Sequence, residues 1–132
     1  AGNHDNSMYN SWWSETHHGV KEEISDDGSL NYVYEIEKNQ SLAKNLKGKL
    51  FLVTGDMDNN VHPGATIRVA NALIKANKRF DLMILPTQRH GFGNMYENNF
   101  WVRADHCSEH LLGLENNEVD IKMINKDIPK NK

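Results

Sequence analysis

Residues 49–63, KLFLVTGDMDNNVHP, decide the fold. Residues 49–54 form a mostly apolar run closed by Gly55, which is typical of a β-strand buried on both faces. The polar segment from Asp56 to His62 predicts a loop, and Pro63 suits the first turn of a helix. The stretch therefore predicts a strand, a loop and the start of a helix, in that order.

The same order repeats downstream. The helix that starts at Pro63 is predicted to end near Asn77, and residues 80–85 predict a second buried strand, stopped by Pro86. A polar loop at residues 87–93 leads to a last helix. On the first helix we expect an apolar face formed by Ile67, Ala70 and Ile74, with Ala72, Leu73 and Ala76 beside it. On the last helix we expect an apolar face formed by Phe100, Ala104, Cys107 and Leu111. Gly113 is predicted to end that helix.

Alternation of buried strands with helices predicts an α/β fold with a parallel sheet. Two parallel strands are too few to stand alone, so we expect an incomplete sheet that is the trailing end of a larger one. Upstream, residues 39–46 predict a short helix, and residues 26–29 predict a turn between two hairpin arms within residues 24–37. We expect one domain segment at residues 1–113 and a polar, mobile tail at residues 114–132.

Composition excludes several classes of protein. The chain has 132 residues and a net charge of −3, which gives no basic excess for binding nucleic acid. Its mean hydropathy is −0.72, and its sequence contains no apolar run of the ~20 residues that a membrane helix needs. A single cysteine, Cys107, excludes an internal disulfide framework and a cysteine-rich zinc module.

Two loops carry the residue types of a hydrolytic site. In parallel sheets the working residues lie beyond the carboxyl ends of the strands. The first loop holds Asp56, Asp58 and His62, and the second holds Arg89 and His90. An acid after one strand and a histidine after the next form the orienting acid and base of a hydrolytic triad. The residues alone leave two alternatives: a turn or weak cation loop at the acid, and a surface histidine in a glycine-containing turn.

A metal site is a weaker interpretation of the seven histidines. His106 and His110 are four residues apart on the predicted last helix, but Cys107 stands where zinc-protease helices place a Glu. Surface histidines account for the pair, so we predict no metal ligands and no cofactor. Trp12 and Trp13 have no basic neighbours that would favour stacking on nucleic acid, and packing or pocket roles fit them better.

Three segments resemble the prolyl oligopeptidase family of serine peptidases. Residues 55–63, GDMDNNVHP, resemble the family's Asp loop, and residues 88–92, QRHGF, resemble its His loop. Residues 10–19, NSWWSETHHG, resemble its aromatic-Thr-Glu-Arg-Tyr-Met-Gly segment. The most similar branch is that of dipeptidyl peptidase IV, especially its bacterial members. The resemblance implies the C-terminal portion of an α/β-hydrolase fold, with the chain order Ser, Asp, His.

By this resemblance Asp58 is the orienting acid and His90 the general base. Asn60 would bind a substrate carbonyl, and Val61 would line the pocket for the residue before the scissile bond. Trp13 would stand in place of a pocket tyrosine. His17 falls where a second pocket aromatic is expected, and this departure puts a strict preference for proline in doubt.

None of the serines has glycines two residues away on both sides, so none is a credible elbow nucleophile. We expect the nucleophile, the oxyanion hole and a propeller domain to lie upstream of Ala1, and the chain by itself to be inactive. The expected partners are this upstream part, a peptide substrate and no nucleic acid. By resemblance the whole protein removes N-terminal dipeptides after Pro or Ala and is periplasmic, extracellular or membrane-anchored. An esterase, an endo-acting peptidase and a non-catalytic module, homodimeric through its sheet edge, stay open alternatives.

Overall fold

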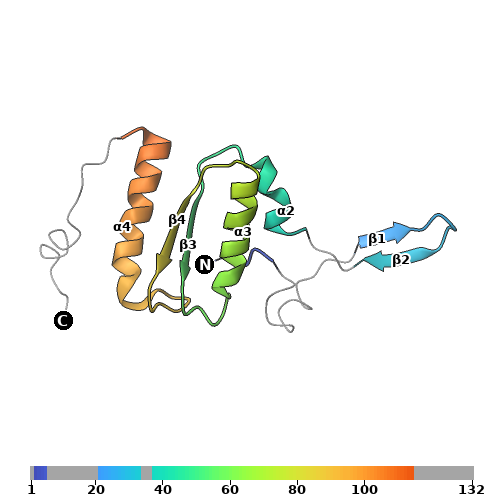
Figure 1. Cartoon of the computed structure of the whole chain (residues 1–132), viewed down its shortest axis with the longest axis horizontal. Helices are drawn as coiled ribbons and strands as arrows, with labels where there is room; N and C mark the ends of the chain where they lie inside the picture. The colour runs from blue at the N-terminus through green and yellow to red at the C-terminus, as the bar shows by residue number, and fades with distance from the viewer. Residues whose placement is uncertain (1, 6–20, 34–36, 115–132) are drawn as a thin grey trace, which may run out of the picture. The chain divides into compact units, whose positions relative to one another are not determined.

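The computed structural model of the chain describes residues 2–5, 21–33 and 37–114 (Figure 1). The chain divides into two compact units, residues 1–90 and residues 91–132. No helix among the described residues is both long and apolar enough to cross a bilayer. The predicted tail lies almost wholly outside the described residues.

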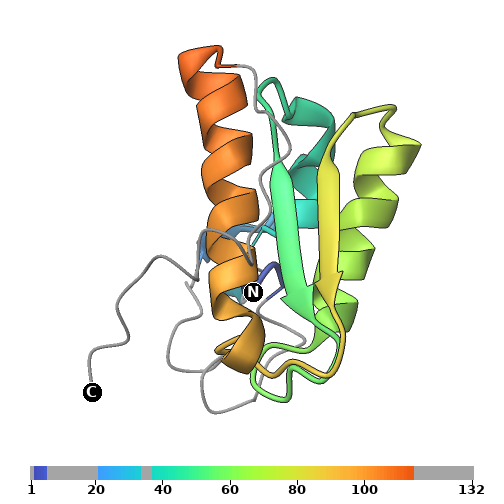
Figure 2. The same ribbon diagram turned by 90° about the vertical axis from the view of Figure 1, so that its left-hand side faces the viewer.

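The first unit contains the parallel pair of strands that the sequence predicts. β3 (Phe51–Gly55) pairs with β4 (Asp81–Leu85), with Phe51 opposite Asp81 and Gly55 opposite Leu85. Figure 2 shows the two arrows pointing the same way, so the loops that follow both strands leave the sheet at the same edge. In the sequence, α3 (Pro63–Lys75) connects β3 to β4. This strand–helix–strand order confirms the predicted α/β class.

The core of this unit lies between α3 and β3. Leu52 on β3 packs with Val69 and Leu73 on α3, and Ala43 joins them from the short helical segment upstream. That segment consists of α2 (Asn39–Leu42) and the 3₁₀ turn η2 (Ala43–Asn45), where the sequence predicts a short helix. The cluster therefore fixes α3 against the sheet beside the loop that follows β3.

Two details of the predicted burial are wrong. Ile67 and Ile74 are exposed on α3, and the buried face runs instead through Ala65, Thr66, Val69, Ala70 and Leu73. Apolar residues surround most of this helix, so periodicity does not select the face that meets β3. On β4, Leu82 and Ile84 are exposed, so this strand is not buried on both faces, and the sheet that it forms with β3 has two strands. The sheet is thus incomplete within the described residues, as predicted.

The predicted hairpin is present upstream. β1 (Lys21–Ile24) pairs antiparallel with β2 (Leu30–Val33), in the register that sets Ile24 opposite Leu30. Gly28 takes a left-handed φ of 81° in the connecting turn, a conformation that glycine adopts without steric cost.

The second unit is helical where it is described. The 3₁₀ turn η3 (Gly93–Met95) leads into α4 (Tyr96–Cys107) and a π-helical turn, η4 (Ser108–Leu112), which ends at Gly113 with a φ of 67°. The predicted apolar face of this helix is wrong in part, because Phe100, Cys107 and Leu111 are exposed. The π-helical turn shifts Leu111 out of the α-helical register on which that prediction rests.

Candidate active site

The loops that follow β3 and β4 bring the predicted acid and base together. Nδ1 of His90 lies 2.9 Å from Oδ2 of Asp58. The two residues are 32 positions apart in the chain, and both belong to the first unit. The parallel pairing of β3 with β4 is what places the two loops at one edge, so the contact follows directly from the topology.

The carboxylate of Asp58 is held by its own loop. Its Oδ1 accepts hydrogen bonds from the main-chain amides of Asn60, at 3.0 Å, and Val61, at 2.8 Å. The Asp58 side chain is 0% exposed, whereas the His90 side chain is 42% exposed. The acid is therefore fixed and shielded from water, while the imidazole stays open to a reacting group.

Electrostatics keep this carboxyl ionised. Burial by itself would raise the pKa of Asp58, but the hydrogen bonds from His90, Val61 and Asn60 outweigh it and hold the pKa below its ordinary value of 3.8. An ionised carboxylate can only accept hydrogen bonds, so Nδ1 of His90 must carry the proton that it shares with Oδ2. This tautomer leaves a lone pair on Nε2, and that atom can accept a proton from a nucleophile.

The remaining predicted site residues have different positions. Asn60 is exposed and Val61 is buried, and the structure brings both to Asp58 through their main-chain amides. Their side-chain roles toward a substrate stay predictions. Trp13 and His17 lie outside the described residues, so their predicted pocket roles also stay predictions.

His62 is the N-cap of α3. Its Nδ1 accepts a hydrogen bond from the main-chain amide of Gly64 at 3.0 Å, which satisfies one of the free donors at the start of the helix. Asp56, two residues before the acid, is exposed. Of the three residues predicted in this loop, Asp58 contacts His90, whereas His62 caps α3 and Asp56 is exposed.

Sequence reasoning missed the tight fit between the two loops. Gln88 is 5% exposed, and its main-chain carbonyl accepts a hydrogen bond from the amide of Met57 at 3.1 Å. Thr87 takes a left-handed φ of 59°, an unfavourable conformation for a β-branched residue. In the sequence, Gly55 marks the end of the apolar run and gives no sign of this contact.

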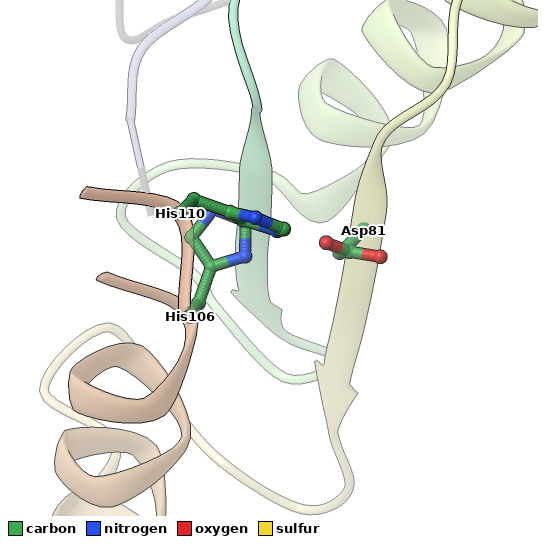
Figure 3. A group of neighbouring side chains, drawn as sticks. All are labelled: Asp81, His106 and His110. Carbon is green, nitrogen blue, oxygen red and sulfur yellow. The ribbon is translucent and has the colours of Figure 1, made fainter. Parts of the chain in front are cut away.

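Two histidines of the second unit are the other candidates for holding an ion (Figure 3). The rings of His106 and His110 meet edge to face, with centroids 4.5 Å apart, and Nδ1 of His110 lies 3.7 Å from Oε1 of Glu109. The two rings thus pack against each other, and a carboxylate lies beside the second of them. Two imidazoles supply only half the ligands of a structural zinc site, so the pair by itself assigns no metal.

Comparisons with known proteins show which family and which solved structure this chain is similar to. The sequence model of the prolyl oligopeptidase family matches residues 1–106. The crystal structure of Porphyromonas gingivalis dipeptidyl peptidase 4 is similar, with 30% sequence identity and a TM-score of 0.49. That match covers 54% of this chain and 10% of the other, so this chain corresponds to a small part of that protein's length. Among curated proteins, no sequence matches this chain.

Proposed function

The chain belongs to the prolyl oligopeptidase family of serine peptidases, and from that premise we propose that it supplies the acid and base of a peptidase active site. Asp58 is the orienting acid and His90 the general base. The observation that carries the proposal is the 2.9 Å contact between His90 Nδ1 and Asp58 Oδ2, formed by loops that follow neighbouring parallel strands. The resemblance of residues 55–63 and 88–92 to the family's Asp and His loops supports the same assignment.

The mechanism assigns each atom a task. A serine outside these 132 residues attacks the scissile carbonyl, and Nε2 of His90 takes its proton as the tetrahedral intermediate forms. The protonated imidazole gives this proton to the leaving amine as the C–N bond breaks, which leaves the acyl-enzyme. Water, deprotonated by the same Nε2, then hydrolyses the acyl-enzyme and the serine regains its proton. Asp58 holds Nδ1–H throughout and stabilises the positive charge on the ring. The amides of Asn60 and Val61 keep the carboxylate from rotating away from the ring during these steps.

The substrate follows from the family branch that the sequence resembles. We propose that the whole protein removes dipeptides from the N-terminus of peptides, preferably after Pro or Ala. Val61 would line the pocket for the residue before the scissile bond, and Asn60 would bind a substrate carbonyl. The pocket would be completed by Trp13 and His17.

The experiment compares this chain with a polypeptide extended upstream of Ala1. Both are treated with a serine-directed fluorophosphonate and assayed on glycyl-prolyl p-nitroanilide. We expect labelling and hydrolysis from the extended polypeptide only, and loss of hydrolysis in its His90→Ala variant. An Arg89→Ala variant is the matched control, because Arg89 is the exposed neighbour of the base. Hydrolysis that survives His90→Ala would overturn the proposal.

Two further substrates separate peptidase from esterase activity. N-acetylation of glycyl-prolyl p-nitroanilide removes the free amine on which an exopeptidase depends, so we expect the blocked substrate to be inert. A simple p-nitrophenyl ester tests for general acyl transfer. Equal turnover of blocked and free anilides would favour endo-acting chemistry, and turnover of the ester alone would favour an esterase.

A further inference from the structure

Gly55, the last residue of β3, lies directly against the loop that carries His90. A Cβ at this position would overlap the carbonyl oxygen of Gln88 and lie 2.8 Å from its carbonyl carbon. Both atoms are main chain, so they cannot swing aside as the end of a side chain can. Gly55 is not among the residues with positive φ. Glycine is therefore required here because there is no room for a Cβ, and not because the backbone adopts a conformation that favours glycine.

A hydrogen bond from the loop after β3 also holds the Gln88 carbonyl, and a second bond lies next to it. The amide of Met57 donates to the Gln88 carbonyl at 3.1 Å, and the amide of Asp56 donates to the carbonyl of Leu85 at 3.2 Å. These two bonds continue the pairing of β3 with β4 into the loops beyond them. Met57 directly precedes Asp58, so the bond joins the two catalytic loops within two residues of the acid and of the base.

The Gln88 side chain anchors this carbonyl in turn. Its Nε2 donates to the carbonyl of Pro86 at 3.2 Å and to Oγ1 of Thr87 at 3.4 Å, and the residue is 5% exposed. Thr87 between them has the unfavourable φ of 59°. A strained residue persists only where its surroundings determine its conformation, which is the situation found here.

We propose that Gly55 and Gln88 are positioning residues, which set the distance between His90 and Asp58 through the contact of the Gln88 carbonyl with the glycine. The catalytic meaning of this inference rests on the proposed function, whereas the contact itself does not. Any side chain at position 55 would push the Gln88 carbonyl outward by about 1 Å to reach ordinary van der Waals separation, and His90 lies two residues beyond it.

The first test is a substitution of Gly55→Ala, with Gly48→Ala as its matched control. Gly48 precedes the same strand, is free of a positive φ, and a Cβ there would meet nothing within 4 Å. The readout in this chain is the downfield NMR signal of the His90 Nδ1–H proton bound to Asp58. We expect Gly55→Ala to shift or abolish this signal and Gly48→Ala to leave it in place. An unchanged signal in a folded Gly55→Ala variant would overturn the inference.

The second test uses turnover by the extended polypeptide. Because misplacement of about 1 Å can cost about 10²-fold in rate, we expect Gly55→Ala to lower kcat about 10- to 100-fold with little change in KM. A variant that moved only KM would contradict a positioning role. If no extended polypeptide hydrolyses peptides while the NMR signal still depends on Gly55, the proposed function fails and the contact stands.

A third measurement applies if Gly55→Ala does not fold. Met57 is exposed and lies beyond the end of β3, so its amide should exchange fast unless its N–H is bonded. We expect its amide in the unmodified chain to be protected from hydrogen exchange by the Gln88 carbonyl, to the degree of the β3 amides. Exchange at the rate of an open loop would overturn the inference.

Discussion

The ring of His90 meets Asp58 through Nδ1, at 2.9 Å from Oδ2, while the other carboxylate oxygen of Asp58 is bound by two main-chain amides. Each oxygen of the carboxylate therefore has its own partners, and Oδ2 is the oxygen that meets the ring. Nε2 is the atom left to exchange protons with a substrate or nucleophile. An acid that is fully buried beside a half-exposed base is the arrangement expected of an orienting residue.

Replacing Asp58 by asparagine should therefore impair catalysis far more than binding. In the Asp58→Asn variant the side-chain amide can offer an N–H to Nδ1, which would favour the wrong tautomer of His90. We expect kcat of the extended polypeptide to fall by about 10⁴-fold, with KM changed little. The matched control is Asp56→Asn, an exposed carboxylate two residues earlier, which should keep normal turnover. Equal losses in both variants would show that the loop tolerates no change of charge, and the role assigned to Asp58 would be wrong.

The lowered pKa of Asp58 also predicts a pH dependence of stability. Between the folded pKa and the ordinary value of 3.8, the unfolded chain binds more protons at this site, so stability rises with pH there. The contribution of Asp58 is complete above pH 3.8 and is lost as the pH falls through the folded pKa. Urea unfolding at several pH values from about 2 to 6 measures this contribution as the difference between the chain and its Asp58→Asn variant. A difference that stays constant across this range would contradict the pKa shift.

The order of the elements and the proximity of Asp58 to His90 could be predicted from the sequence, because both follow from the linear pattern of apolar runs, loops and helix starts. The run that ends at Gly55 gives the strand, Pro63 starts the helix, and parallel pairing then sets Asp58 near His90. The buried face of α3 could not be predicted in this way. Apolar residues lie on several sides of that helix, and only contact with Leu52 selects Leu73 over Ile74.

The fit of the loops needed the three-dimensional structure. A close approach of two main chains, such as that of Gly55 and Gln88, leaves no periodic signal in either segment. The strain at Thr87 is hidden for the same reason, because a threonine in a loop usually has negative φ. The residue type of His62 fits a catalytic site equally well, and only the structure shows that its ring caps a helix.

Relieving the strain at Thr87 should stabilise the chain. Asparagine tolerates the left-handed region better than a β-branched residue, and it already stands at Asn77, where φ is 53°. We expect Thr87→Asn to raise the free energy of unfolding by about 0.5–1 kcal/mol, measured by urea denaturation. Thr87→Val keeps the branched carbon and serves as the control, with no gain expected. A gain of the same size in both variants would rule out backbone strain as the cause.

The cap at His62 predicts a smaller effect. Removing the acceptor in His62→Ala leaves the amide of Gly64 without its side-chain partner, which should cost about 0.5–1 kcal/mol of unfolding free energy. Aspartate accepts the same hydrogen bond and also suits the positive end of the helix, so His62→Asp should restore or exceed the original stability. Thermal unfolding followed by circular dichroism measures both. Equal losses in the two variants would mean that the His62 ring acts by something other than capping.

We expect the largest loss of stability from a substitution in the hydrophobic core between α3 and β3. Leu73 is 2% exposed and packs with Leu52 and Val69, whereas its neighbour Ile74 is 67% exposed. Truncating a buried leucine removes its contacts and leaves a cavity, so Leu73→Ala should cost about 2–5 kcal/mol. Ile74→Ala removes a side chain of the same size from the exposed side and should change stability by about 0.5 kcal/mol or less. Urea denaturation of the two variants decides which face of α3 meets the sheet. Equal losses of stability in the two variants would contradict the packing described for this helix.

The same substitution should also affect the contact of His90 with Asp58. Because α3 begins directly after the loop of Asp58, we expect Leu73→Ala to weaken the NMR signal of the His90 Nδ1–H proton before the chain unfolds globally. An equal weakening by Ile74→Ala would contradict this packing.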